Sequence, residues 1–170
     1  MTLSIVILAV VTAQRLGELV LARRNTARLL ARGATESGAA HYPLIVGLHA
    51  TWLAGLWLLA WDRPASLGWL GVFLALQVLR VWVIASLGER WTTRIIVLPD
   101  APPVRRGPYR FLAHPNYLVV AGEMLALPLV FDLLAFGLVF SAMNAAVLRI
   151  RIRAETAALS AAPAKPPIGA

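Results

Sequence analysis

Four blocks of nearly unbroken apolar residues constrain the fold of this chain more than any other feature of its sequence. The blocks are Thr2–Ala22, Tyr42–Ala60, Leu67–Leu87 and Tyr117–Ile150. Each of the first three approaches the roughly 20 residues that a helix needs to cross a bilayer core of about 30 Å. Lipid offers no hydrogen bonds to exposed backbone groups, so such segments must be helical. With 59% hydrophobic residues, the chain is predicted to be an all-α integral membrane protein.

The last block is longer than one membrane helix requires and is interrupted near its middle. Pro128 and Asp132 stand there, and both disfavour an uninterrupted helix. We therefore predict a hairpin of two short helices with Asp132 at or near the bend, each arm shorter than a comfortable span. The prediction is a single domain of about five transmembrane helices over residues 1–159. The Ala- and Pro-rich tail, residues 160–170, is predicted to be disordered.

The basic residues fall between the apolar blocks and predict the orientation of the chain in the membrane. The formal net charge is +8. Three loops or tails carry most of the arginines: the segments around Arg23–Arg32, Arg90–Arg110 and Arg149–Arg153. The positive-inside rule places these three clusters in the cytoplasm and the N-terminus outside. Because the charges accompany membrane segments, they indicate contact with lipid headgroups and not with nucleic acid.

A polar segment, Arg106–Tyr117, lies between apolar blocks and is the predicted location of the chemistry. It contains arginines, a histidine, an asparagine and two tyrosines. Asn116 and Glu123 are seven residues apart, two helical turns, and so share a face. Asn144 on the return helix is placed to meet that face, and Arg149 and Arg153 form a stripe farther along. We expect these groups to converge on a polar pocket at the cytoplasmic interface.

Charged residues also occur inside the predicted spans. Arg15 and Glu18 are three residues apart and lie on one helical face, where they form either a structural ion pair or one wall of a polar cavity. Arg80 lies three residues after Gln77, and we expect its side chain to extend toward the cytoplasmic interface.

Several kinds of site are excluded or disfavoured by the sequence. Cysteine is absent, which excludes disulfides, thiolate metal sites and cysteine nucleophiles. The spacing of His41, His49 and His114 fits no metal-binding motif, so no metal is predicted, and the first two are expected to be structural. The chain also lacks a dinucleotide-binding glycine motif, a phosphate-binding P-loop and a Gly-x-Ser-x-Gly nucleophile motif.

Taken together, the motifs resemble those of the isoprenylcysteine carboxyl methyltransferase family. The resemblance rests on Gly107–Arg110, His114–Tyr117, Glu123, Asn144 and Arg149–Glu155, and extends over about Arg15 to Leu159. It is most similar to a small bacterial subgroup that includes O-methyltransferases of alkylpyrones and alkylresorcinols. The resemblance implies an integral-membrane enzyme that uses S-adenosylmethionine.

The same resemblance implies roles for individual residues. The catalytic residues it suggests are Glu123, Asn144 and Arg149. The residues it suggests for cofactor binding are Tyr109, Arg110, His114, Pro115, Asn116, Tyr117, Arg153 and Glu155. Members of the family commonly have an arginine directly before His-Pro, whereas this chain has Ala113, so Arg110 or Arg106 is expected to take over its contact.

The methyl acceptor is left open between two lipophilic classes, a prenylcysteine carboxylate and a polyketide hydroxyl. A carboxylate is already anionic and needs no base, whereas for a hydroxyl the candidate bases are Glu123 and His114. Two other functions are carried as alternatives: a sterol-reductase-like membrane enzyme that uses NADPH, and a non-enzymatic membrane adaptor or transporter. The oligomeric state is not predicted.

Overall fold

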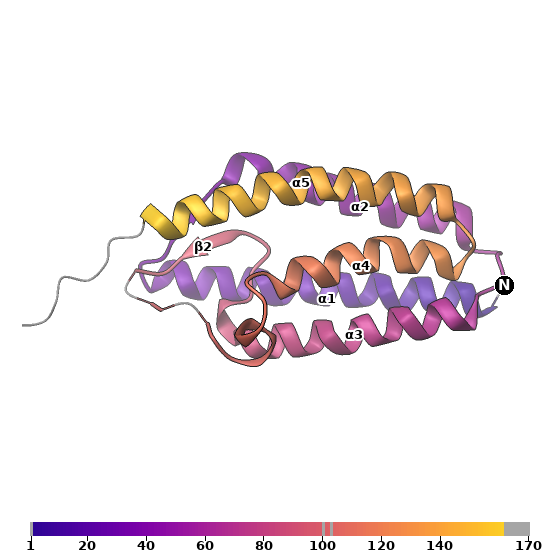
Figure 1. Cartoon of the computed structure of the whole chain (residues 1–170), viewed down its shortest axis with the longest axis horizontal. Coiled ribbons are helices and arrows are strands. Elements are labelled where there is room, and N and C mark those ends of the chain that lie inside the picture. Colours follow the sequence, from indigo (N-terminus) through magenta and orange to yellow (C-terminus); the bar gives the residue numbers. More distant parts are fainter. Residues whose placement is uncertain (1, 100, 103, 162–170) are drawn as a thin grey trace, which may run out of the picture.

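The computed structural model describes residues 2–99, 101–102 and 104–161 and consists mainly of five α-helices. The helices are α1 (Thr2–Ala31), α2 (Tyr42–Ala60), α3 (Leu67–Leu87), α4 (Pro115–Val130) and α5 (Leu134–Ala161). They run roughly antiparallel and form an elongated bundle (Figure 1). The expected all-α membrane fold is confirmed. The predicted tail lies almost entirely outside the described residues.

Two helix lengths differ from those expected. α1 continues to Ala31, nine residues beyond the apolar block, because Arg23–Arg32 contains good helix formers and the first glycine after it is Gly33, with φ of 85°. The hairpin arms are unequal: α4 has 16 residues and α5 has 28. The prediction of two short arms is therefore wrong for α5. Within the described part of the chain, four helices are long and apolar enough to span a bilayer, and α4 is the shorter fifth.

The bend of the hairpin lies where the sequence predicted it. Pro128 is in the last turn of α4, and its carbonyl accepts hydrogen bonds from the backbone N–H groups of Phe131 and Leu133, both at 3.0 Å. Asp132 has a φ of 56°, in the left-handed region that Asp tolerates better than most residues. The backbone N–H of Ser66 donates to the carbonyl of Val130 at 2.7 Å, which fixes the start of α3 against this bend.

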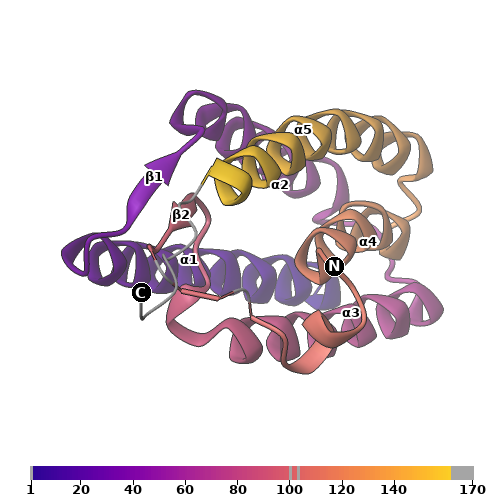
Figure 2. The same ribbon diagram turned by 60° about the vertical axis from the view of Figure 1, so that its left-hand side comes forward.

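The hydrophobic core fills the end of the bundle nearest this bend. Leu8 of α1, Leu56 of α2, Phe73 of α3 and Leu127 of α4 are almost fully buried there. α4 packs closely against both α3 and α5. In the view of Figure 2, α2 and α5 lie on one side of the bundle and α1, α3 and α4 on the other. The two sides are joined by the core at one end and by loops at the other.

The loop end is held by a short two-stranded sheet. β1 (Thr35–Ser37) follows α1, and β2 (Ile95–Val97) follows α3; they pair antiparallel, with Thr35 opposite Val97. Arg94 donates two hydrogen bonds to the Glu36 carboxylate at 2.8 Å across this pair. The sheet lies beside the last turns of α5 (Figures 1 and 2). It therefore closes one side of the loop end.

The polar segment identified in the sequence docks against the end of α3. It begins with the 3₁₀ turn Gly107–Arg110, whose first residue has a φ of 58°. A Cβ at Gly107 would lie 2.0 Å from the hydroxyl oxygen of Ser86, so a side chain there is excluded both by conformation and by contact. Arg106 donates from Nε to the Ser86 carbonyl at 2.7 Å. Pro115 then begins α4, in a position where its missing N–H costs nothing.

Candidate functional site

Two cavities lie end to end between the helices and the loops. The inner cavity, about 310 Å³, lies inside the bundle between α1, α2, α4 and α5. The outer cavity, about 140 Å³, lies at the loop end among the residues after α3, the turn before α4 and the last turns of α5. The residues that line both are Trp91, Thr92, Asn116, Tyr117 and Arg151. We call these five the shared wall.

The two cavities differ in chemical character. Much of the inner cavity is lined by aliphatic and aromatic side chains, among them Leu16, Ile45, Trp52 and Val147. The outer cavity contains Arg90, Arg94, Tyr109, His114 and Glu155. The inner cavity therefore suits an apolar molecule, and the outer cavity suits a charged or polar one.

The shared wall is organised by hydrogen bonds around Tyr117. Its hydroxyl donates to the carboxylate of Glu155 and accepts a bond from Nε of Arg151 at 2.9 Å. Arg151 also donates from Nη1 to the carbonyl of Thr93 at 2.7 Å. The ring of His114 stacks on that of Tyr117 with centroids 5.3 Å apart. These contacts join α4, α5 and the loop after α3 into one polar wall.

Two asparagines at this site have buried polar atoms without partners. Asn144 is 1% exposed, and neither its amide nitrogen nor its amide oxygen is hydrogen-bonded within the described residues. The Oδ1 of Asn116 is also buried and unpartnered. A buried polar atom without a partner costs about 1–3 kcal/mol. Both side chains line the inner cavity, so a ligand that bonded them would remove this cost.

A network of four charges borders the inner cavity, with Arg80 and Glu123 buried and Arg15 and Glu18 partly buried. Glu123 accepts from Arg15 at 2.8 Å and Arg80 at 2.9 Å through one oxygen and from Gln77 at 2.7 Å through the other. Glu18 in turn accepts from Arg80 at 2.5 Å and Arg15 at 3.0 Å. The expected Arg15–Glu18 pair is present. The expectation for Arg80 is wrong: its side chain is buried, because two carboxylates from other helices compensate its charge inside the bundle.

The structure brings together most of the residues predicted for the site. Tyr109, His114, Asn116, Tyr117 and Glu155 line the outer cavity. Asn144 lines the inner cavity, and Pro115 is buried as the first residue of α4.

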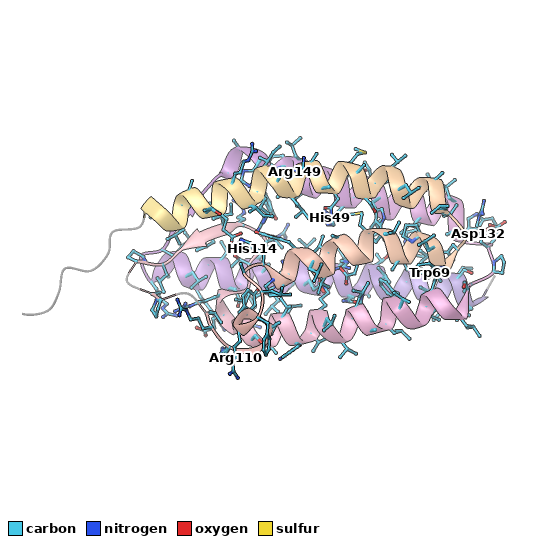
Figure 3. All side chains as sticks on the ribbon, viewed as in Figure 1. His49, Trp69, Arg110, His114, Asp132 and Arg149 are labelled. Atoms are coloured by element: carbon cyan, nitrogen blue, oxygen red, sulfur yellow. The ribbon has the colours of Figure 1, made fainter. Side chains whose placement is uncertain are left out.

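The remaining predicted residues lie elsewhere. Arg149 and Arg153 are exposed on α5, and neither lines a cavity. Arg110 is also exposed and, in Figure 3, extends away from the bundle. Glu123 is buried in the charge network and lines neither cavity. Arg106 and Arg110 were expected to replace the arginine that this chain lacks at Ala113, but neither lines the outer cavity. Arg90 and Arg94 line it together with Ala113.

Arg151 and the Trp91–Thr93 segment line the cavities but are not among the site residues predicted from the sequence. A signal for Arg151 exists: it follows Asn144 by seven residues, two helical turns, and so shares its face. Arg149 follows Asn144 by five residues and is rotated by about 140° from it. The start of the Trp91–Thr93 segment is held by Asn25 of α1. The Asn25 amide donates hydrogen bonds to the carbonyls of Gly88 at 3.2 Å and Trp91 at 2.8 Å. That contact joins residues 66 positions apart and has no local signal.

Tyr109 is an outer-cavity residue outside the membrane-spanning helices whose acidity is perturbed. Burial, and secondarily the negative charge of Glu155, raise the pKa of the Tyr109 phenol above its usual value. The phenol therefore stays protonated at physiological pH and remains a hydrogen-bond donor. Within the described residues, no group of three or more His, Asp or Glu side chains is placed to hold a metal ion.

Comparison with known proteins connects this site to a family. The sequence model of the Isoprenylcysteine carboxyl methyltransferase (ICMT) family matches residues 69–161, which include most of α3 and all of the polar segment, α4 and α5. A Bacillus subtilis (strain 168) protein named Uncharacterized protein YpbQ is 39% identical over 158 residues, covering 90% of this chain and 94% of the relative. A Haemophilus influenzae (strain ATCC 51907 / DSM 11121 / KW20 / Rd) protein, named Uncharacterized protein, is 26% identical over 159 residues, covering 89% and 92%. No solved structure matches the chain significantly.

Proposed function

This chain belongs to the isoprenylcysteine carboxyl methyltransferase family, and from that premise we propose that it transfers a methyl group from S-adenosylmethionine to an oxygen of a lipophilic acceptor. Membership makes it a membrane methyltransferase in general terms. The donor, the acceptor class and the residues involved are parts of the proposal.

The observation that carries the proposal is the shared wall between two cavities of different character. A transferase of this kind must bring a water-soluble donor and a membrane-soluble acceptor into contact, because positioning supplies much of the catalysis of a displacement reaction. The polar outer cavity suits the donor, and the largely apolar inner cavity suits the acceptor. The reacting atoms would then meet at Asn116, Tyr117 and Arg151.

The residues of the outer cavity fit the chemical groups of S-adenosylmethionine. When bound, this cofactor supplies an electrophilic methyl group on a positively charged sulfur. Arg90, Arg94 or Arg151 would pair with its carboxylate, and Glu155 would accept from its ammonium or ribose hydroxyls. The stacked rings of His114 and Tyr117 offer an aromatic face to the adenine. The unpartnered Oδ1 of Asn116, a residue of the shared wall, is a further acceptor.

The inner cavity is suited to a molecule with a polar head and an apolar body. Asn144 supplies an unpartnered amide on α5. The aliphatic walls of the inner cavity would hold a prenyl or alkyl chain and exclude water from the reacting oxygen. A prenylcysteine carboxylate and a polyketide hydroxyl are both acceptors of this form. Glu123 is assigned a positioning role, since its two oxygens already accept hydrogen bonds from two arginines and Gln77.

The orientation proposed from the arginine distribution puts the outer cavity on the cytoplasmic side. The three arginine clusters lie at the C-terminal ends of α1, α3 and α5 or directly after them. These helix ends are at the same end of the bundle as the outer cavity (Figure 1). Trp69 and Asp132 lie toward the opposite end (Figure 3). A donor made in the cytoplasm would thus reach the outer cavity directly, while the acceptor enters from the bilayer.

Ligand binding tests the donor. The purified protein in detergent should gain thermal stability with S-adenosylmethionine or S-adenosylhomocysteine, since a ligand that binds only the folded state stabilises it; 100-fold excess over Kd corresponds to about 2.7 kcal/mol. NADPH serves as the comparison ligand. A shift with NADPH and none with either methyl-donor ligand would reject the methyltransferase proposal in favour of the reductase alternative.

Methyl transfer with two matched arginine variants tests the site. Radiolabelled S-adenosylmethionine is incubated with long-chain prenylcysteine and hydroxylated polyketide acceptors. Arg151→Met should lower transfer by about 100-fold or more, because it removes a buried charge from the shared wall. Arg149→Met, on the exposed face of the same helix, should retain nearly full activity. The opposite ranking of the two variants would show that the shared wall is not the reaction site.

A further inference from the structure

His49 lies on the inner cavity and takes no part in the site described above. It is on α2, two turns after Tyr42, and lines the cavity with Ile45, Val46 and Leu53 of the same helix. Figure 3 shows it between the α2–α5 side of the bundle and α4. A histidine facing a cavity between membrane helices requires a reason, because polar side chains are costly there.

One hydrogen bond fixes which nitrogen of His49 carries the proton. Nδ1 is 2.8 Å from the carbonyl oxygen of Ile45. A carbonyl oxygen only accepts, so Nδ1 must be the donor and hold a hydrogen. In the neutral ring, Nε2 then has a free lone pair, and within the described residues it accepts no hydrogen bond. The Ile45 carbonyl orients the ring as a second group orients the base in enzymes that activate a nucleophile.

The charged side chains that line the cavity with His49 come from α1, α3 and α5. α1 contributes Arg15 and Glu18, α3 contributes Arg80, and α5 contributes Arg151. The phenols of Tyr42 and Tyr117 also line it. Arg15 and Arg80 are neutralised by Glu18 and by Glu123 of α4, so the network adds no net charge beside the ring.

The other candidate bases are less well placed. Both oxygens of Glu123 already accept hydrogen bonds from Arg15, Gln77 and Arg80, and its side chain lines neither cavity. His114 lines the outer cavity and not the inner one, with its Nδ1 3.9 Å from the Glu155 carboxylate. In the inner cavity, His49 is the histidine with an available lone pair.

We propose that His49 is the general base of this enzyme and accepts the proton of an acceptor hydroxyl bound in the inner cavity. The inference rests on the proposed methyl transfer and extends it to a neutral phenol or enol as the acceptor. An apolar cavity disfavours an ionised hydroxyl, so proton removal has to accompany the reaction. A carboxylate acceptor would need no such base.

The step balances without another reagent. The acceptor O–H bond breaks, and its proton passes to Nε2 of His49, giving an imidazolium that Ile45 still holds through Nδ1. The oxygen forms a bond to the methyl carbon, whose bond to sulfur breaks with the electron pair remaining on sulfur. The positive charge that was on sulfur is thereby transferred to the imidazolium, which later releases its proton to solvent.

The variant His49→Gln, which keeps a polar side chain of similar reach, tests the inference. With a long-chain alkylphenol acceptor, kcat should fall about 100-fold, the lower range for loss of a general base, with little change in KM. With a prenylcysteine carboxylate, the variant should match the wild type. His41→Gln is the matched control, because His41 lines neither cavity. An unchanged rate with the alkylphenol, or equal losses with both acceptors, would overturn the role of His49.

The pH profile and a spectroscopic probe distinguish a base from a structural residue. In the wild type, kcat for the phenol should decline toward low pH as Nε2 becomes protonated, and this limb should be absent in the variant. Without any methyl donor, a long-chain alkyl nitrophenol bound to the wild type should show an increased ionised fraction, read by visible absorbance, and in the variant it should not. Equal ionisation in both proteins would overturn the inference. Absence of transfer by the wild type to every acceptor, in contrast, would reject the proposed function itself.

Discussion

Replacing Glu123 by glutamine tests whether this carboxylate stabilises the bundle or performs the chemistry. Glu123 is 2% exposed, and its oxygens accept from Arg15, Gln77 and Arg80 at 2.7–2.9 Å. The substitution keeps the shape of the side chain and removes one of the two negative charges that compensate Arg80, which is buried, and Arg15, which is partly buried. Removing one partner of a buried ion pair costs about 3–5 kcal/mol, because the remaining charge is left uncompensated.

This loss is large enough to measure by thermal unfolding in detergent. For a chain of this size, each kcal/mol corresponds to about 2–4 °C in Tm, so Glu123→Gln should lower Tm by roughly 6–20 °C. Asp132→Asn is the matched control: its carboxylate is exposed at the hairpin bend, and Asn tolerates the same φ of 56°. The control should leave Tm nearly unchanged.

A double variant separates charge compensation from general disruption. If Glu123 acts through Arg80, then Arg80→Met should cost less in the Glu123→Gln background than in the wild type, with a coupling of about 0.5–3 kcal/mol. A Glu123→Gln protein with the wild-type Tm that binds S-adenosylhomocysteine normally but transfers no methyl group would refute this reasoning. In that case Glu123 would have the catalytic role first suggested by its place in the sequence.

Two further variants test the geometry of the site. Gly107→Ala should displace the turn before α4, because the new Cβ would meet the Ser86 hydroxyl and the residue has a left-handed φ. The variant should lose about 1–3 kcal/mol of stability, measured as a lower Tm. It should also bind the methyl donor more weakly, measured by ligand titration. Gly68→Ala is its control, because no atom lies within 4 Å of a Cβ there. Asn144→Leu should leave the ligand-free protein as stable as the wild type or more so, by removing unpartnered polar atoms, while methyl transfer falls at least tenfold. A marked drop in its Tm would mean that Asn144 is bonded within the protein.

The sequence also identified which segments make the site, but not which side chain of each segment points inward. The spacing of α5 shows the difference. Arg149 and Arg153 were grouped by their four-residue spacing, yet the bundle turns that face outward and directs Asn144 and Arg151 into the cavities. Helical spacing predicts which residues share a face, whereas packing against α2 and α4 decides which face is buried.

The sequence by itself determined the helices, the hairpin bend at Asp132 and the polar segment before α4. These depend on short-range properties: the length of apolar blocks against bilayer thickness, and the backbone preferences of Pro, Gly and Asp. Only the tertiary structure decided that Arg80 is buried between Glu18 and Glu123, that Asn25 fixes the loop at Trp91, and that two cavities meet at one wall. Those features depend on contacts between residues more than 40 positions apart, whose partners are set by how the helices pack and not by their spacing along the chain.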